Sequence, residues 1–124
     1  MNNYMDIGKL AGTEVNIVIN WWSKNLESFP QKNIESFKQC LSGMIYGRIC
    51  NHWYPDNPAK GSGYRAIIND YHIDPILKQA CEISGIDTNF LASQCVLIIS
   101  PGIVRIRSTI SDKEEVIYSG VPII

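Results

Sequence analysis

HWYPDNPAKGSGYRAI, residues His52–Ile67, is the stretch that decides the fold of this chain. It places two prolines, two glycines and three aromatic residues within sixteen positions. Proline fixes φ and lacks an N–H, whereas glycine admits positive φ, so this composition predicts a defined, turn-rich segment rather than a slack linker. We call this segment the connector, because it joins a helical half of the chain to a strand-rich half.

The composition of the whole chain is that of one ordinary domain. It has 124 residues, of which 45% are hydrophobic and 19% charged. The formal net charge of −1 provides no field that would attract nucleic acid or an anionic membrane. The N-terminus lacks the basic and apolar regions of a signal peptide, and no apolar run reaches the ~20 residues that span a bilayer. We therefore expect a soluble intracellular protein.

The four cysteines, Cys40, Cys50, Cys81 and Cys95, contain no CxxC pair. This spacing favours four buried, reduced thiols. The run Cys50–His52 lacks the second pair of ligands that a zinc site requires, so no metal is expected.

Two segments before the connector have apolar residues at helical spacing. We expect a flexible N-terminus over residues 1–12 and a single domain over residues 13–124. Thr13 is the expected N-cap of the first helix, with Glu14 in its first turn.

Pro30 suits the first turn of the second helix, and the short loop between the two helices predicts an antiparallel hairpin. Trp21 and Trp22 lie among aliphatic residues at helical spacing, which favours core packing over ligand stacking.

After the connector the pattern changes to strands and short helices. Residues Gly63–Ile68 predict a strand with Tyr64, Ala66 and Ile68 on one side. Asp74 and Pro75 are a favourable N-cap and first helical residue, and Gly85 a favourable stop for a helix whose apolar side includes Ile83. A further short helix is expected after Asp87.

The last third of the chain predicts three elements of a sheet. Cys95–Ile99 is continuously apolar, as in a central strand covered on both faces. Residues 104–109 alternate in polarity like a half-exposed strand, and residues 116–118 form the returning strand after a polar loop. The predicted fold class is α+β: a helical hairpin and further short helices packed on a small, mostly antiparallel sheet.

The connector closely resembles box A of the BTG/Tob antiproliferative family, in the pattern HWYPxxPxKGSGYR at His52–Arg65. Other residues that fall where the family has them are Phe37, Asp74-Pro75, Ala80, Ser84-Gly85, the Pro101 turn and Tyr118. The resemblance implies a BTG domain that acts as a non-enzymatic adaptor. It implies binding to a Caf-type deadenylase subunit, with mRNA decay and restrained proliferation as the outcome. A monomer in the cytoplasm and nucleus is implied, with no cofactor, no direct nucleic-acid contact and no membrane contact.

The same resemblance assigns candidate partner-binding residues and no catalytic ones. Tyr64 corresponds to a box A tyrosine implicated in the deadenylase contact, and Lys60 and Trp53 also match box A.

Box B departs from the family run Trp-Val-Asp-Pro, because Ile98-Ile99-Ser100-Pro101 stands in its place. Isoleucine lacks the flat ring and indole donor of tryptophan, and serine removes a negative charge. The alternative is therefore a divergent protein of the same fold that has lost deadenylase binding and uses another protein partner or self-association.

Two other classes of function are weaker alternatives. The run Lys60–Tyr64 faintly resembles an RNA-binding strand, and Arg105 and Arg107 could contact phosphate, but the chain has no basic surplus. His52 and His72 could serve as bases, yet no orienting group or carboxylate pair stands at a recognisable spacing.

Overall fold

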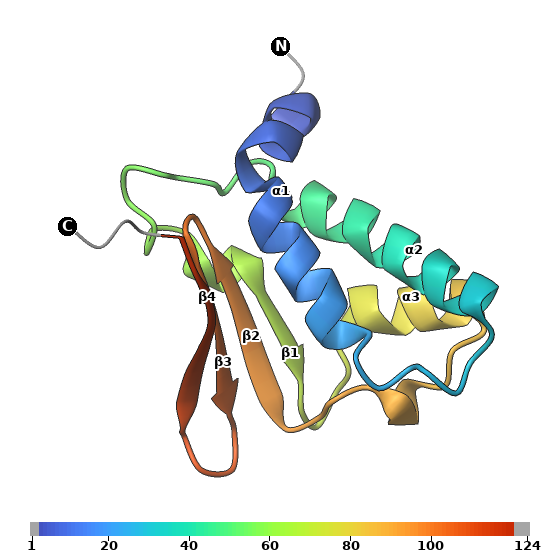
Figure 1. Cartoon of the computed structure of the whole chain (residues 1–124). Helices are drawn as coiled ribbons and strands as arrows, with labels where there is room; N and C mark the ends of the chain where they lie inside the picture. Colours follow the sequence, from blue (N-terminus) through green and yellow to red (C-terminus); the bar gives the residue numbers. More distant parts are fainter. Residues whose placement is uncertain (1–2, 121–124) are drawn as a thin grey trace.

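Three helices lie against one face of a four-stranded sheet (Figure 1). The computed structural model describes residues 3–120, with side chains from Ala11 onward. The helices are α1 (Asn3–Trp22), α2 (Gln31–Ile49) and α3 (Pro75–Ser84), with short 3-10 helices η1 (Ser62–Arg65) and η2 (Thr88–Phe90). The strands are β1 (Ala66–Asn69), β2 (Cys95–Ser100), β3 (Ile103–Ser108) and β4 (Glu114–Ser119). The predicted α+β class is confirmed, and every pairing within the described sheet is antiparallel.

Helix α1 begins earlier than its sequence suggests. The expected N-cap at Thr13 is wrong, because the backbone is already helical from Asn3 and Thr13 lies inside the helix. Met1 and Asn2, the start of the expected flexible segment, lie outside the described residues. Glu14 is 7% exposed, and its Oε2 accepts the backbone N–H of Gly102 at 2.9 Å. Its carboxylate therefore ties α1 to the turn between β2 and β3 instead of stabilising a helix start.

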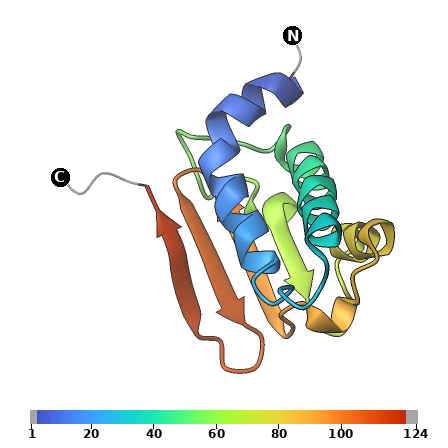
Figure 2. The ribbon, with the colours of Figure 1, turned by 45° about the vertical axis from the view of Figure 1, so that its right-hand side comes forward.

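The predicted hairpin of α1 and α2 forms the layer over the sheet (Figure 2), and its apolar side chains meet those of the strands. Pro30 is the N-cap of α2, one position before the place expected for it. Among the fully or nearly fully buried side chains are Val15, Val18, Ile19, Trp22, Leu26, Phe37, Leu41, Ile45, Ile49, Ile67, Leu97, Ile99, Val104 and Ile106. Trp22 is 1% exposed, so the preference for core packing over ligand stacking is confirmed at this residue.

The start and stop signals of α3 act as predicted. The Asp74 side chain accepts the N–H of Ile76, Pro75 follows it, and Gly85 ends the helix at φ 71°. Asp87 likewise caps η2. The assignment of Ile83 to the apolar side is wrong: it is 57% exposed, and Ser84 is buried on the packed side instead.

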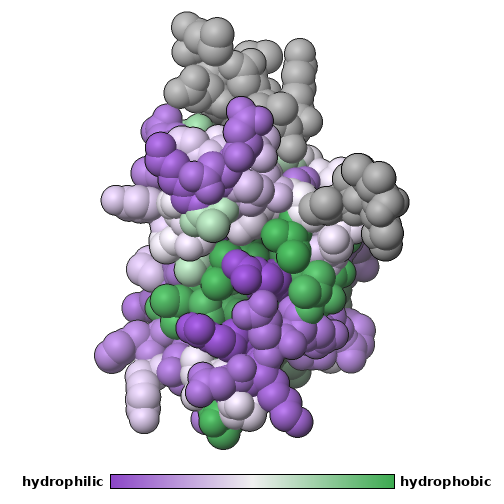
Figure 3. All heavy atoms as spheres, turned by 90° about the vertical axis from the view of Figure 1, so that its left-hand side faces the viewer, coloured by the Kyte–Doolittle hydropathy of each residue, from purple (hydrophilic) through white to green (hydrophobic). Residues whose placement is uncertain are grey.

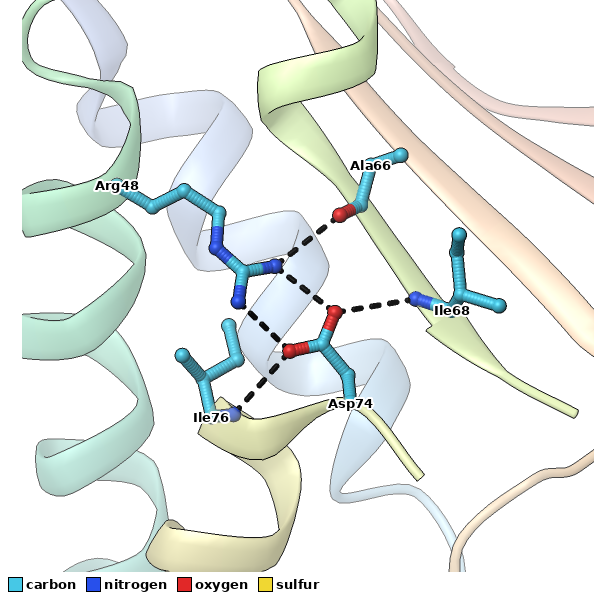
Figure 4. Close-up of polar contacts among 5 residues, drawn as sticks. All are labelled: Arg48, Ala66, Ile68, Asp74 and Ile76. Atoms are coloured by element: carbon cyan, nitrogen blue, oxygen red, sulfur yellow. Dashed lines mark hydrogen bonds and ion pairs between the residues drawn. The ribbon is translucent and has the colours of Figure 1, made fainter. Parts of the chain in front are cut away.

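Arg48 and Asp74 connect α2, β1 and α3 (Figure 4). The guanidinium donates to both carboxylate oxygens at 2.8 and 2.7 Å and to the carbonyl of Ala66 at 3.1 Å. The carboxylate also accepts the N–H groups of Ile68 and Ile76. Burial alone would raise the pKa of Asp74, but these hydrogen bonds and the charge of Arg48 outweigh it and lower that pKa below its ordinary value.

The strand order β1-β2-β3-β4 gives the sheet two faces of different character. In antiparallel strands, residues directly opposite each other share a face. One register row, Ile67, Leu97 and Ile106, faces the helices and is buried. The two neighbouring rows face away from the helices. One consists of Ala66, Ile98, Arg105 and Val116, and the other of Ile68, Val96, Arg107 and Glu114. The predicted central strand, β2, does lie inside the sheet with residues buried on both faces.

Two further expectations concern cysteines and membranes. Cys81 and Cys95 are buried, but Cys40 and Cys50 are only half-buried, so the prediction of four buried thiols is half right; all four are free. Within residues 3–120, none of the helices has both the length and the apolar character needed to cross a bilayer.

Candidate functional site

The connector is a series of tight turns that ends in η1. The predicted strand over Gly63–Ile68 is wrong in its first half, because residues Ser62–Arg65 form a 3-10 helix and β1 begins only at Ala66. Gly61 has φ 75°, a left-handed conformation suited to glycine, and its carbonyl accepts the Tyr64 N–H at 3.0 Å. The turn therefore sets the direction in which the side chains of residues 64 and 65 leave the backbone.

Arg65 holds the connector against the end of β2 from inside. Its side chain is 0% exposed. Its five N–H donors meet five acceptors: Ile99 O (2.7 Å), His52 O and Lys60 O (2.6 Å each), Pro58 O (2.5 Å) and Ser100 Oγ (3.3 Å). Burial lowers the pKa of Arg65, partly offset by Tyr54, yet an arginine remains charged at physiological pH. Three of the five acceptors belong to the connector, so this one side chain fixes its shape.

Tyr64, the first predicted site residue, lies on the surface. Its side chain is 62% exposed. Its ring stacks on that of His52, with centroids 3.9 Å apart and an angle of 4° between the planes. The stacking joins the two ends of the connector, while most of the tyrosine side chain stays exposed to solvent.

Lys60 and Trp53, the other predicted site residues, are placed differently. Lys60 is exposed, and its Nζ lies 4.6 Å from the centre of the Tyr54 ring, a cation–π distance. Trp53 is half-buried and packs against the core, with the Arg65 guanidinium carbon 5.9 Å from its ring centre. Lys60 and Tyr64 thus share the outside of the connector, whereas Trp53 serves largely to support it.

The two altered box B positions point in opposite ways. Ile98 is partly exposed and directly opposite Ala66, on the sheet face away from the helices. Ser100 is 2% exposed, and its hydroxyl accepts a hydrogen bond from Arg65. The side chain at position 100 therefore meets Arg65 inside the domain, whereas Ile98 lies at the surface of the sheet.

The sheet face away from the helices carries an apolar patch crossed by polar side chains (Figure 3). We define the candidate face as Tyr64, Ala66, Ile68 and Ile98. Beyond these residues the same sheet face carries exposed Val116 and Arg107, and Arg105 paired with Glu114 at 3.4 Å. An aromatic ring beside aliphatic side chains with a polar surround is the anatomy of a protein-binding surface.

The described part of the chain offers little support for a catalytic cysteine or a metal site. Burial, with Asp87 and Glu82 nearby, raises the pKa of Cys81 to about 11, and burial also raises that of Cys95. These two thiols stay protonated near neutral pH and are poor nucleophiles. Among residues 11–120 no three His, Cys, Asp or Glu side chains are grouped closely enough to hold a metal ion.

An open groove of about 470 Å³ lies at the other end of the sheet, between the end of α1 and the β3–β4 hairpin. Trp21, Cys95, Ile106, Ile110 and Glu115 are among its lining residues. One side of the Trp21 ring is already covered by Lys24, whose Nζ is 3.9 Å from the ring centre. The groove shares no lining residue with the candidate face.

Residues 11–119 match the family model described as BTG family. The chain belongs to the BTG family. A BTG family protein of Dictyostelium discoideum is 35% identical over 101 residues, which cover 76% of this chain and 24% of that protein. Human protein BTG1 is 29% identical over 120 residues, covering 94% of this chain and 69% of its own length. Human protein Tob1 is 32% identical over 75 residues, covering 60% of this chain and 22% of its own length.

The structure of the BTG/Tob domain of C. elegans FOG-3 has the same fold. It superposes with a TM-score of 0.77 at 20% identity and covers 87% of this chain and 82% of that one. The BTG domain predicted from the box A pattern is thereby confirmed. This chain spans only about a quarter of the Dictyostelium relative, so the activities of the longer proteins do not transfer as wholes.

Arg65 is the residue of the BTG domain whose role the sequence reasoning missed. A signal was present in the alternation predicted for this segment: Tyr64, Ala66 and Ile68 share one side, which leaves Arg65 on the other side with Ile67, and both Arg65 and Ile67 are buried. An arginine on the buried side of an otherwise apolar alternation indicates a structural guanidinium with several acceptors.

Proposed function

We propose that this chain is a non-enzymatic adaptor that binds a Caf-type deadenylase subunit and so promotes mRNA decay and restrains proliferation. Membership of the BTG family supports an antiproliferative adaptor role. The observation that carries the proposal is the placement of Tyr64: the box A tyrosine is 62% exposed and held by stacking on His52. Two residues further on, Ala66 pairs with Ile98 of box B, so the two boxes form one surface.

The chemistry of this surface suits a folded protein partner better than a small molecule or nucleic acid. The candidate face is open and aliphatic, with one rigid aromatic side chain that costs little conformational entropy to immobilise. Positive charge at Lys60 and Arg107 lies near it, but glutamates lie there too, and the chain as a whole is slightly acidic. Direct binding to RNA would require a denser array of cations.

The absence of tryptophan at position 98 sets the expected strength of binding. Tryptophan anchors at interfaces often contribute more than ~2 kcal/mol, or about thirtyfold in affinity. Ile98 retains only part of this apolar contact. We therefore expect an affinity below that of a BTG protein with an intact box B, or a partner whose surface compensates. Action in the cytoplasm and nucleus, as a monomer, is part of the same proposal.

The test is to tether the chain to a reporter mRNA in cells of its own host. Poly(A) length and mRNA half-life are measured over time after transcription is stopped. The proposal predicts a shorter tail and a shorter half-life than with the tether alone, and loss of both effects with Tyr64→Ala. A tail of unchanged length with the wild-type chain would contradict deadenylase recruitment. In that case the divergent alternative, another partner or self-association, would be favoured.

A further inference from the structure

Arg65 joins the connector to the end of β2 through two acceptors, the carbonyl of Ile99 and the hydroxyl of Ser100. Ser100 Oγ lies 3.3 Å from Nη2 of Arg65, and both side chains are buried. The other four acceptors of the guanidinium are backbone carbonyls. The ion pairs of the described residues, Arg48–Asp74 and Arg105–Glu114, do not include Arg65. Among the described residues, the buried positive charge of Arg65 is thus not paired with a carboxylate.

We propose that Arg65 and Ser100 are positioning residues, and that the side chain at position 100 sets how firmly the connector, and with it Tyr64, is held. On this view residue 100 acts within the domain and does not touch the partner. The effect on affinity rests on the proposed function, whereas the effect on the connector requires no partner.

Burial and distance both support an internal role. Ser100 is 2% exposed, so a side chain there cannot reach a docked protein unless the connector first opens. A carboxylate in this place would meet the guanidinium and add the attraction of an opposite charge to the hydrogen bond that the serine hydroxyl already accepts. The aspartate of the family box B pattern would therefore act here as an internal counter-charge. Its replacement by serine leaves Arg65 with a weaker partner, and a less rigid face costs more to order on binding.

Three backbone amides within the connector report on how firmly it is held. The N–H groups of Asn57, Lys60 and Tyr64 each donate to a connector carbonyl at 3.0 Å. Their hydrogen exchange is measured in the wild type and in Ser100→Ala, Ser100→Asn and Ser100→Asp. Asparagine matches aspartate in shape but carries no charge. Ser93, an exposed residue before β2, receives the same alanine and aspartate changes as a control.

The proposal predicts that these amides exchange about fivefold faster in Ser100→Ala and about tenfold slower in Ser100→Asp at pH 7. Ser100→Asn should not reproduce the slowing, and the Ser93 variants should match the wild type. Equal exchange in all Ser100 variants, or equal slowing by asparagine and aspartate, would overturn the proposal.

Titration of the same variants with the Caf-type subunit separates this inference from the proposed function. Affinity should rise from alanine through serine to aspartate, in the order of slowing exchange. Affinity that changes while exchange does not would show that residue 100 contacts the partner, and would overturn the inference. Exchange that follows the predicted order while no variant, wild type included, binds the subunit would sustain the inference and refute the proposed function.

Discussion

The rings of His52 and Tyr64 lie parallel at a centroid distance of 3.9 Å, although twelve positions of turn-rich chain separate them. His52 follows the end of α2, and Tyr64 belongs to the 3-10 helix just before β1. Their contact closes the connector into a loop whose outer rim is exposed. The histidine thus orients the tyrosine.

His52→Ala should weaken deadenylase binding without removing any group that faces the partner. An aromatic pair contributes about 0.5–1.5 kcal/mol beyond its buried area, so the loss should be about two- to twelvefold in Kd. Surface plasmon resonance measures the effect, and His72→Ala, an exposed histidine elsewhere, is the control. Equal affinities for His52→Ala and the wild type would show that the stacking does not prepare Tyr64.

Ile98→Trp should tighten binding, because it restores the box B aromatic ring on the candidate face. Ile98 lies opposite the small side chain of Ala66, which leaves room above the sheet. We expect a gain of about tenfold in affinity, part of the contribution typical of a tryptophan anchor. Val116→Trp places the same ring on β4 of the same face and should change Kd little. No gain from Ile98→Trp would mean that the partner does not use this position.

Arg65→Met should destabilise the fold strongly, because five acceptors, two of them in buried hydrogen bonds, would lose their donor. We expect the free energy of unfolding to fall by at least ~3 kcal/mol. Urea denaturation followed by tryptophan fluorescence measures it. Arg107→Met, on the exposed side of β3, should change it by less than about 0.5 kcal/mol. A similar small loss for both variants would contradict the role given to Arg65.

Asp74→Asn should cost stability in a pH-dependent way. Burial opposes the charged form, but the hydrogen bonds and charge of Arg48 outweigh it, so the pKa of Asp74 is lower in the folded than in the unfolded state. As pH falls, the Asp74 carboxylate therefore binds a proton in the unfolded state before it does so in the folded state. The stabilisation by Asp74 is complete above its unfolded pKa of about 3.9 and is lost as pH falls through its folded pKa.

At pH 7 the loss should be about 2 kcal/mol, and it should shrink below about pH 4. Urea denaturation of both proteins at a series of pH values measures the difference. Asp56→Asn, at an exposed aspartate of the connector, should alter stability by less than about 0.5 kcal/mol. A loss for Asp74→Asn that stays constant down to pH 2 would contradict the ion pair.

Much of this fold follows from local signals in the sequence. The Asp74-Pro75 start and the Gly85 stop of α3 depend on neighbouring residues alone, so they are readable from the chain. The alternation around Ile67 and the apolar run of β2 likewise identify the sides and centre of the sheet. The box A pattern also selected Tyr64 and Lys60, and both side chains are exposed.

The failures share a cause, because each depends on a contact between distant segments. Thr13 has the chemistry of a cap, yet the helix continues through it, and Glu14 pairs with Gly102 far along the chain. Ser100 ends β2, but only the fold shows that Arg65 lies beside it. Ile83 matches the helical period of α3, yet its side chain stays exposed.

The most direct test of the docking face is the affinity of the chain for the Caf-type deadenylase subunit of its own organism, measured by isothermal titration calorimetry. The account predicts saturable one-to-one binding that Tyr64→Ala weakens at least ~tenfold, with little change in stability because the ring is 62% exposed. Tyr71→Ala, which removes a tyrosine that is 95% exposed and lies between β1 and α3, should leave Kd within about twofold. No saturable binding by the wild type, or equal losses from the two tyrosine variants, would contradict it.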